Sequence, residues 1–190
     1  MSVSYDFAGK VVLITGGGSG IGAATAVEFA RYGAQVVIGD IDATGLTQAA
    51  TQCLNVSPNA LKALQVLADV TKEGDLQRLV DTTITACGQL DILVNNAGVS
   101  RNININHPDY MTSYKRILST NLDSSVHLTH LCVQYLEKTK GVIVYTSSVM
   151  AYQATPDFSA YCMSKAAINM FTKCMAIELG GKGIRVNSVK

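Results

Sequence analysis

The sequence predicts an α/β fold in which a doubly wound parallel sheet lies between two layers of helices. Three observations carry this prediction: short runs rich in β-branched residues and leucine, longer segments of helical periodicity between them, and a regular alternation of the two along the chain. Short apolar runs bounded by polar or glycine-bearing segments are typical of strands buried on both faces. Parallel strands need crossover connections, and right-handed helical crossovers cover both faces of the sheet.

Each predicted element corresponds to one stretch of the sequence. The strands are expected at residues 11–14, 36–38, 64–67, 92–94 and 142–144, and a sixth strand begins within residues 184–189. The helices are expected at residues 21–32, 44–54, 76–87, 114–136 and 161–179. Because no internal repeat, low-complexity tract or linker interrupts the alternation, residues 1–190 are expected to form a single domain.

Composition and charge argue against several kinds of partner. The 190 residues are 48% hydrophobic, enough for a sizeable core, and carry 15 basic and 14 acidic side chains without a basic run. No apolar run approaches the roughly 18 residues that span a bilayer, and residues 1–10 lack the pattern of a signal peptide. We therefore expect a cytoplasmic protein with no nucleic-acid or membrane partner.

Neither the cysteines nor the histidines suggest a bridge or a metal site. The sequence contains three histidines and five unevenly spaced cysteines: His107, His127, His130, Cys53, Cys87, Cys132, Cys162 and Cys174. An odd number of cysteines with irregular spacing suits neither a disulfide framework nor paired zinc ligands. We expect the cysteines to be reduced and mostly buried, and no metal to be bound.

A glycine-rich segment, residues 15–22 with the sequence TGGGSGIG, joins the first strand to the first helix. Glycines at 16, 20 and 22 let the backbone turn tightly and approach a ligand. The amino end of the following helix offers unpaired amide hydrogens and the positive end of the helix dipole, which favour an anion such as pyrophosphate. The glycines alone would be equally typical of a plain tight turn, and their position after the first strand favours a nucleotide site.

Asp40 ends the second strand, about twenty residues past the glycine-rich segment, where a carboxylate can accept hydrogen bonds from an adenosine ribose. The same carboxylate would repel a 2′-phosphate, and the neighbouring Gly39, Ile41 and Ser19 provide no cation to hold one. NAD is therefore expected rather than NADP. The alternative is a solvated carboxylate at the end of a strand.

Asp69 and Val70 follow the third strand. An aspartate here can bind the edge of an adenine base while the valine packs nearby. It could equally cap the next helix, and both interpretations stay open.

Together with three further motifs, these features resemble the short-chain dehydrogenase/reductase family. The motifs are residues 95–98 (NNAG), Ser148 and residues 161–165 (YCMSK), and the match runs from about Lys10 to Val189. Several motifs in the correct order are more specific than any one of them. The resemblance implies a Rossmann fold, hydride transfer between NAD(H) and a secondary alcohol or ketone, and a homo-oligomer, a dimer or tetramer.

The resemblance also implies a catalytic tetrad of Asn121, Ser148, Tyr161 and Lys165. Tyr161 and Lys165 are four residues apart, so a helix brings them to neighbouring positions on one face. A cation within a few ångströms lowers the pKa of a phenol, ordinarily near 10, by about 1–3 units, which suits a proton donor or acceptor. Ser148 is preferred to Ser147 because it lies thirteen residues before Tyr161, as the family motif requires.

The other roles follow from the same resemblance. Lys165 would also contact the nicotinamide ribose, and Ser148 would hydrogen-bond the substrate oxygen. Asn121 would relay protons through water. The alternative is that this asparagine simply breaks or bends the helix in which it lies. Asn95, at the carboxyl edge of the sheet, would fix the neighbouring backbone close to the cofactor. The residues expected to contact the cofactor are Gly16, Ser19, Gly20, Ile21, Gly22, Asp40, Asp69, Val70, Asn95, Ala97, Gly98, Tyr161 and Lys165.

Family members normally continue past the sixth strand, whereas this sequence stops at Lys190. We therefore expect the sheet to be incomplete at its carboxyl-terminal edge, the last strand to be an exposed edge, and the usual substrate lid to be lacking. Two functions stay open: an active oxidoreductase, and an inactive shortened form that binds nucleotide weakly or associates with full-length partners. The remaining candidates for substrate contact, Ser100, Met150, Gln153 and Phe158, suggest a partly apolar pocket, although Met150 and Phe158 could equally fill the core.

Overall fold

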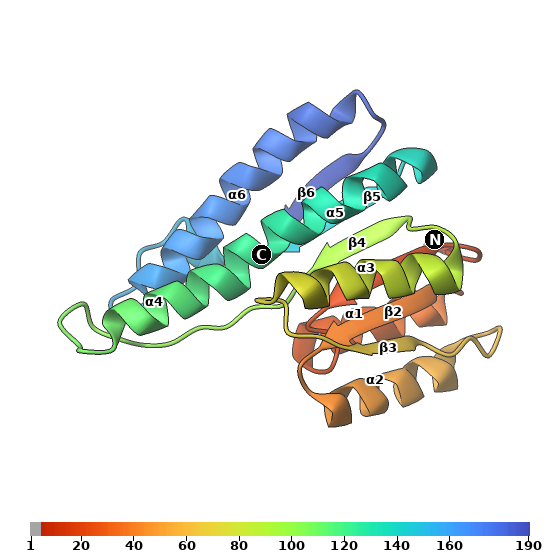
Figure 1. Cartoon of the computed structure of the whole chain (residues 1–190), viewed down its shortest axis with the longest axis horizontal. Coiled ribbons are helices and arrows are strands. Elements are labelled where there is room, and N and C mark those ends of the chain that lie inside the picture. The colour runs from red at the N-terminus through yellow and green to blue at the C-terminus, as the bar shows by residue number, and fades with distance from the viewer. Residues whose placement is uncertain (1–4) are drawn as a thin grey trace, which may run out of the picture.

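The computed structural model describes residues 5–190, which form a six-stranded parallel sheet between two layers of helices (Figure 1). The strands are β1 (Val11–Thr15), β2 (Gln35–Asp40), β3 (Leu64–Leu67), β4 (Ile92–Asn95), β5 (Val142–Thr146) and β6 (Arg185–Val189). Their order across the sheet is β3-β2-β1-β4-β5-β6, and each pair of neighbours is parallel. The predicted fold class is confirmed.

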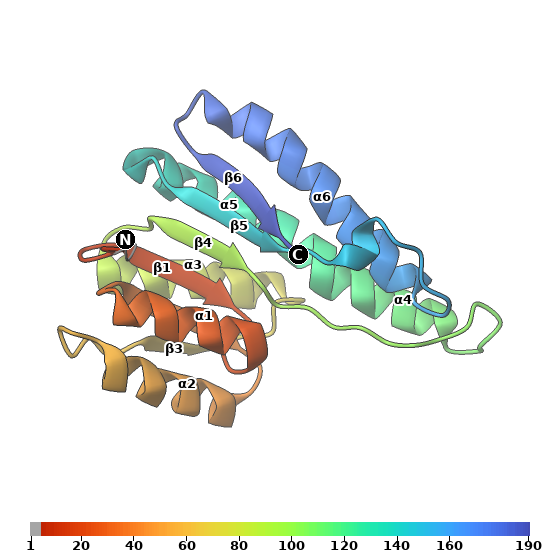
Figure 2. The ribbon, with the colours of Figure 1, turned by 180° about the vertical axis from the view of Figure 1, so that it is seen from behind.

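Helices connect the successive strands. They are α1 (Gly20–Arg31), α2 (Ala43–Val56), α3 (Glu73–Cys87), α4 (Tyr110–Leu118), α5 (Ser124–Thr139) and α6 (Ser159–Gly180). Figure 2 shows α1 and α2 on one face of the sheet, and Figure 1 shows α3, α5 and α6 on the other. Among residues 5–190, no helix is both long and apolar enough to span a membrane.

Side-chain alternation along the strands divides the core into two clusters. Successive residues of a strand point to opposite faces of the sheet. Val12 and Ile14 of β1 therefore join the cluster under α1 and α2, whereas Val11 and Leu13 join the cluster under α3, α5 and α6. A fully buried side chain of this size contributes about 1.5–3 kcal/mol, so these four residues fix β1 at the centre of the sheet.

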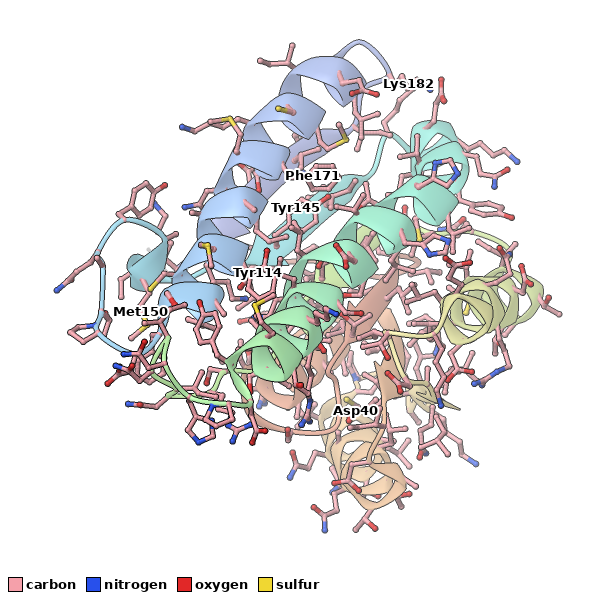
Figure 3. The ribbon with its side chains drawn as sticks, turned by 60° about the vertical axis from the view of Figure 1, so that its left-hand side comes forward. Asp40, Tyr114, Tyr145, Met150, Phe171 and Lys182 are labelled. Carbon is pink, nitrogen blue, oxygen red and sulfur yellow. The ribbon has the colours of Figure 1, made fainter. Side chains whose placement is uncertain are left out.

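Tyr145 of β5 docks the two long helices on the sheet. It is fully buried, its hydroxyl lies 2.7 Å from Thr129 Oγ1 on α5, and its ring meets Phe171 of α6 edge to face at 5.7 Å (Figure 3). Two helices and one strand thus converge on a single side chain. This contact helps to set the position of α6, which carries Tyr161 and Lys165.

As expected, the last strand is an edge of the sheet. β6 pairs with β5 on one side only, and Arg185, Asn187 and Val189 are exposed. The cluster under α3, α5 and α6 extends to Val186, whereas the opposite cluster ends at a half-buried Val142. Helices therefore cover β5 and β6 on one face only within the described residues.

The helix predicted at residues 114–136 differs from the structure at two points. α4 begins at Tyr110, and a π-helical segment, η1 (Ser119–Asp123), separates α4 from α5. A short 3₁₀ helix, η2 (Val149–Ala151), was also not predicted. The π-helical segment contains Asn121, so the α-helical hydrogen-bond pattern is interrupted at this asparagine.

The expectation that the cysteines are mostly buried is only partly correct. Cys53 and Cys132 are buried, Cys87 and Cys162 are half-buried, and Cys174 is exposed on α6. No disulfide joins them within the described residues. Burial raises the pKa of the Cys53 thiol to about 11, so this side chain behaves as a small apolar residue.

Candidate active site

A cavity of about 540 Å³ opens at the carboxyl ends of the strands, where the chain order reverses between β1 and β4. Ligands of open α/β sheets bind at such a reversal. Eleven of the thirteen residues expected to contact the cofactor line the cavity: Gly16, Ser19, Gly20, Ile21, Asp40, Asp69, Val70, Ala97, Gly98, Tyr161 and Lys165. The two others, Gly22 and Asn95, do not. Figure 3 shows Asp40 near α2, far from Met150, which lies beside the start of α6.

The glycine-rich segment packs the start of α1 tightly against β1. Gly16 and Gly20 have φ of 65° and 51°, a left-handed conformation that favours glycine. A Cβ on Gly22 would overlap the carbonyl oxygen of Gly16, which explains why Gly22 supports the turn without lining the cavity. A Cβ on Gly20 would meet nothing within 4 Å, so the backbone there is open to a ligand. Ser19, the N-cap of α1, makes no side-chain hydrogen bond to the helix.

Asp40 supports the glycine-rich segment and also faces the cavity. Its Oδ2 accepts a hydrogen bond from the Gly18 amide at 2.9 Å, and its Oδ1 accepts one from the Asp42 amide at 3.0 Å. A carboxylate has about four acceptor sites, so two remain for a ligand. The side chain is half-buried and bonded to the segment that it follows, which favours the ligand-binding interpretation over a merely solvated carboxylate.

Asp69 does not cap α3. Its Oδ1 accepts hydrogen bonds from the Thr71 hydroxyl at 2.7 Å and the Thr71 amide at 3.0 Å, whereas the N-cap position of α3 is Lys72. These two hydrogen bonds lower the pKa of Asp69 below its usual value, and the bond from the Thr71 hydroxyl has the larger effect. The helix-capping alternative is thus excluded, and an ionised carboxylate lies in the cavity wall.

Asn96, and not Asn95, fixes the backbone at the end of β4. Asn96 Nδ2 donates to the carbonyls of Thr15 at 3.1 Å and Gly16 at 3.2 Å, and its Oδ1 accepts a hydrogen bond from Thr146 Oγ1 at 3.1 Å. Asn95 is buried, and its Nδ2 has no hydrogen-bond partner among residues 5–190. The role expected for Asn95 is therefore corrected to Asn96, because adjacent residues at the end of a strand point in opposite directions.

The sequence motifs contain Thr15 and Asn96 but did not indicate their roles at this junction, and they do not include Thr146. Thr15 Oγ1 accepts hydrogen bonds from the Asn96 and Ala97 amides at 3.1 and 3.2 Å. With Thr146 and Asn96, it ties the carboxyl ends of β1, β4 and β5 together. The signal that could have found them is a polar residue at or directly after the carboxyl end of three apolar strands.

Tyr161 and Lys165 lie together on α6 at the cavity. Lys165 Nζ is 5.6 Å from the centre of the Tyr161 ring and donates a hydrogen bond to the Thr146 carbonyl at 2.6 Å. Lys165 is only 4% exposed, and this burial lowers its pKa to about 8. A cation is thus held beside the phenol by the helix spacing and by the end of β5.

Asn121 lies in the π-helical segment η1 and holds the chain that follows β4. Its Oδ1 accepts a hydrogen bond from the Val99 amide at 2.8 Å, and its Nδ2 donates to the Val99 carbonyl at 2.9 Å and to Ser164 Oγ at 3.1 Å. A Cβ on Gly98 would lie 3.4 Å from Asn121 Oδ1 and 3.6 Å from Lys165 Nζ. Asn121 and Lys165 therefore flank the same short stretch of backbone.

Ser147 and Ser148 point to different places, as expected. Ser147 is buried, and its hydroxyl donates to Asn169 Oδ1 at 2.7 Å. Ser148 is half-buried, two residues past the cavity residue Thr146, and its Oγ accepts a hydrogen bond from the Met150 amide at 3.1 Å. The Ser148 hydroxyl keeps its proton free to donate.

Of the residues proposed for substrate contact, only Ser100 lines the cavity. Met150 is half-buried in η2, Gln153 is exposed, and Phe158 precedes α6. The cavity also has residues that the sequence did not indicate, among them Arg116 and Thr120.

Comparisons with known proteins agree with this geometry. The sequence pattern of the family described as short chain dehydrogenase matches residues 10–190. The chain is 41% identical over 179 residues to 11-beta-hydroxysteroid dehydrogenase 1A of Arabidopsis thaliana, covering 94% of this chain and 50% of that protein. It thus spans about half the length of the first curated relatives that it matches.

Two solved structures have the same architecture. NAD⁺-bound xylitol dehydrogenase superposes with a TM-score of 0.90 at 30% identity, covering 97% of this chain and 70% of that one. 7 alpha-hydroxysteroid dehydrogenase, complexed with NADH and 7-oxo glycochenodeoxycholic acid, also superposes with a TM-score of 0.90. It is 35% identical, and the match covers 96% of this chain and 70% of that one. The chain belongs to the short-chain dehydrogenase/reductase family and has its six-stranded parallel sheet.

Proposed function

We propose that this chain binds NAD and transfers a hydride between NAD(H) and a secondary alcohol or its ketone. One observation carries the proposal: the Tyr161–Lys165 pair lies in the same cavity as the glycine-rich segment and Asp40. An anion-binding helix end and a proton-transferring pair within one cavity are what this reaction requires. The names of the two structural neighbours, which refer to NAD⁺ or NADH and to alcohol or ketone ligands, also support it.

The residues present fit an NAD molecule along the cavity. Gly20, with open space in place of a side chain, and the amino end of α1 would hold the pyrophosphate. Asp40 would accept hydrogen bonds from the adenosine ribose, and Lys165, at the other end, would donate to the nicotinamide ribose. NAD is preferred to NADP because the Asp40 carboxylate would repel a 2′-phosphate.

The chain's own side chains supply the proton transfer. In the direction of alcohol oxidation, Tyr161 Oη takes the hydroxyl proton of the substrate, and in reduction it returns a proton to the carbonyl oxygen. Lys165 keeps a positive charge beside this phenol, since its pKa of about 8 leaves it mostly protonated at neutral pH. The Ser148 hydroxyl donates to the substrate oxygen as negative charge develops there. When bound, the cofactor supplies the acceptor or donor of the hydride.

Asn121 acts on this site through the backbone. Its two hydrogen bonds to Val99 and its bond to Ser164 hold the stretch after β4 against α6, where Lys165 lies. The proton relay implied for Asn121 by the family resemblance would start from this position.

The test is turnover of NAD by the purified chain with a panel of secondary alcohols, followed by the absorbance of NADH. We expect activity that Tyr161→Phe reduces by at least about 10²-fold, the usual scale of a lost general acid or base. Tyr152→Phe is the matched control, because Tyr152 is exposed and outside the cavity, and it should retain activity. Equal turnover by the wild type and Tyr161→Phe would refute the proposal.

A second candidate function is association without catalysis, and one observation favours it. Met163, Met170 and Ile177 are 46%, 58% and 84% exposed on α6, seven residues apart, so they form one apolar stripe along the helix. A second copy could cover this stripe in a homodimer. Absence of turnover from both the wild type and Tyr161→Phe, with a dimer in sedimentation analysis, would support this function over the first.

A further inference from the structure

We propose that Arg116 binds the adenine base of the dinucleotide, as the cation of the adenosine end of the cavity. The inference rests on the proposed function, because it assumes that the cavity holds NAD. It concerns a residue that the sequence motifs did not indicate.

Arg116 is an arginine at the cavity with no partner of its own. It lies in the last turn of α4, lines the cavity and has an exposed side chain. Arg31, Arg78 and Arg101 pair with carboxylates, whereas Arg116 and Arg185 make no ion pair among residues 5–190, and of these two only Arg116 lines the cavity. Its guanidinium is therefore free to bind a ligand.

The helix geometry places Arg116 at the adenosine end. Arg116, in the last turn of α4, and Thr120, in the π-helical segment η1, both line the cavity. Adjacent helical residues point in different directions, so Thr120 does not share the direction of Asn121, which bonds to Ser164 of α6, and the exposed Arg116 does not share that of the buried Ile117. In Figure 1, α6 and α3 flank α5, the continuation of α4, on opposite sides. The side away from α6 is that of α3, whose preceding loop brings Asp69, Val70 and Thr71 into the cavity.

The chemistry of this end calls for a cation. Asp40 and Asp69 place two carboxylates here, and the pyrophosphate of NAD adds further negative charge. Adenine has an amino group that can donate a hydrogen bond to a carboxylate such as that of Asp69. It also has ring nitrogens that accept hydrogen bonds and therefore need a donor. A guanidinium is planar, donates hydrogen bonds from its edge and stacks on aromatic faces, so it complements Asp69 on the same base.

The test is calorimetric titration of the 190-residue chain with NAD and with ADP-ribose, which lacks the nicotinamide. We expect Arg116→Gln to lower the affinities for NAD and for ADP-ribose by the same factor, about 3- to 10-fold, which is the scale of a cation–aromatic contact. Lys115→Gln is the matched control: it removes an equal charge from the adjacent exposed residue, which does not line the cavity, and should leave both affinities unchanged. Because Arg116 is exposed, the variant should unfold at the wild-type temperature.

Three outcomes would overturn the inference. Equal affinities of Arg116→Gln and Lys115→Gln would exclude a contact and leave the proposed function intact. Weaker binding of NAD with unchanged binding of ADP-ribose would place Arg116 at the nicotinamide end. Absence of binding of both ligands to the wild type would overturn the proposed function and the inference together.

Discussion

At the scale of single residues, the candidate site contains a charge whose burial opposes folding. Lys165 is 4% exposed and has only the Thr146 carbonyl at 2.6 Å and the Tyr161 ring to compensate its lost hydration. Its pKa falls from 10.5 to about 8 because of that burial. The proposed function gives a reason for this residue, since burial of the charge opposes folding at neutral pH.

This shift predicts how stability depends on pH. Below pH 8 both the folded and the unfolded chain carry the charge on Lys165, and the cost of burial is complete. Between pH 8 and 10.5 the folded chain loses the proton first, so the wild type gains stability relative to Lys165→Met, by about 3 kcal/mol over the whole interval. Above 10.5 both states are neutral and the gain is complete.

The measurement is urea unfolding of the wild type and Lys165→Met at several pH values. The difference between them is informative, because the hydrogen bond lost to Thr146 is absent from the variant at every pH. A difference that stays constant from pH 7 to 11 would show that Lys165 is not desolvated in the folded chain. Lys173→Met, on the exposed face of the same helix, serves as the control.

At the scale of elements, the carboxyl ends of β1, β4 and β5 are joined by side chains as well as by the sheet. Asn96 and Thr15 bridge β1 to β4, and Thr146 extends the connection to β5. This network holds the cavity floor from which Ala97 and Gly98 continue. Because its polar groups lie next to the proposed cofactor site, we expect the loss of this network to lower both stability and cofactor binding.

Asn96→Ala is expected to lower the free energy of unfolding by about 1–3 kcal/mol, because it leaves the Thr15 and Gly16 carbonyls without their donor. Asn95→Ala should cost less, since the Asn95 amide group has no partner to lose. Chemical denaturation of the two variants measures both values. A larger loss for Asn95→Ala would mean that the assignment of the bridging role to Asn96 is wrong.

The strands and most helices could be predicted because their causes are local. Apolar runs such as residues 11–14 and the spacing of Tyr161 and Lys165 are written in consecutive residues. The π-helical segment at Asn121 could not be predicted, because it accompanies hydrogen bonds to Val99 and Ser164, 22 and 43 residues away. Likewise, the choice between Asn95 and Asn96 depends on which face of the sheet each meets, and the sequence motif contains both.

At the scale of the whole molecule, the order of the strands decides what the cavity brings together. The reversal between β1 and β4 places Gly16 and Asp40 on one side of the cavity and Tyr161 on the other, although 121 residues separate Asp40 from Tyr161 in the sequence. The sequence motifs indicated which residues should meet there. They did not indicate Arg116 or Thr120, which reach the cavity only because α4 and η1 cross its rim.

The central claim is that this cavity binds NAD selectively, and the most direct measurement is calorimetric titration of the 190-residue chain with NAD and NADP. The Asp40→Asn variant should be titrated in parallel, because this substitution removes the charge and keeps an oxygen that can accept a hydrogen bond from the Gly18 amide. We expect the wild type to bind NAD more tightly than NADP, and the ratio of the two affinities to fall by about 10-fold or more in Asp40→Asn. Equal binding of the two dinucleotides by the wild type, or no binding of either, would contradict it.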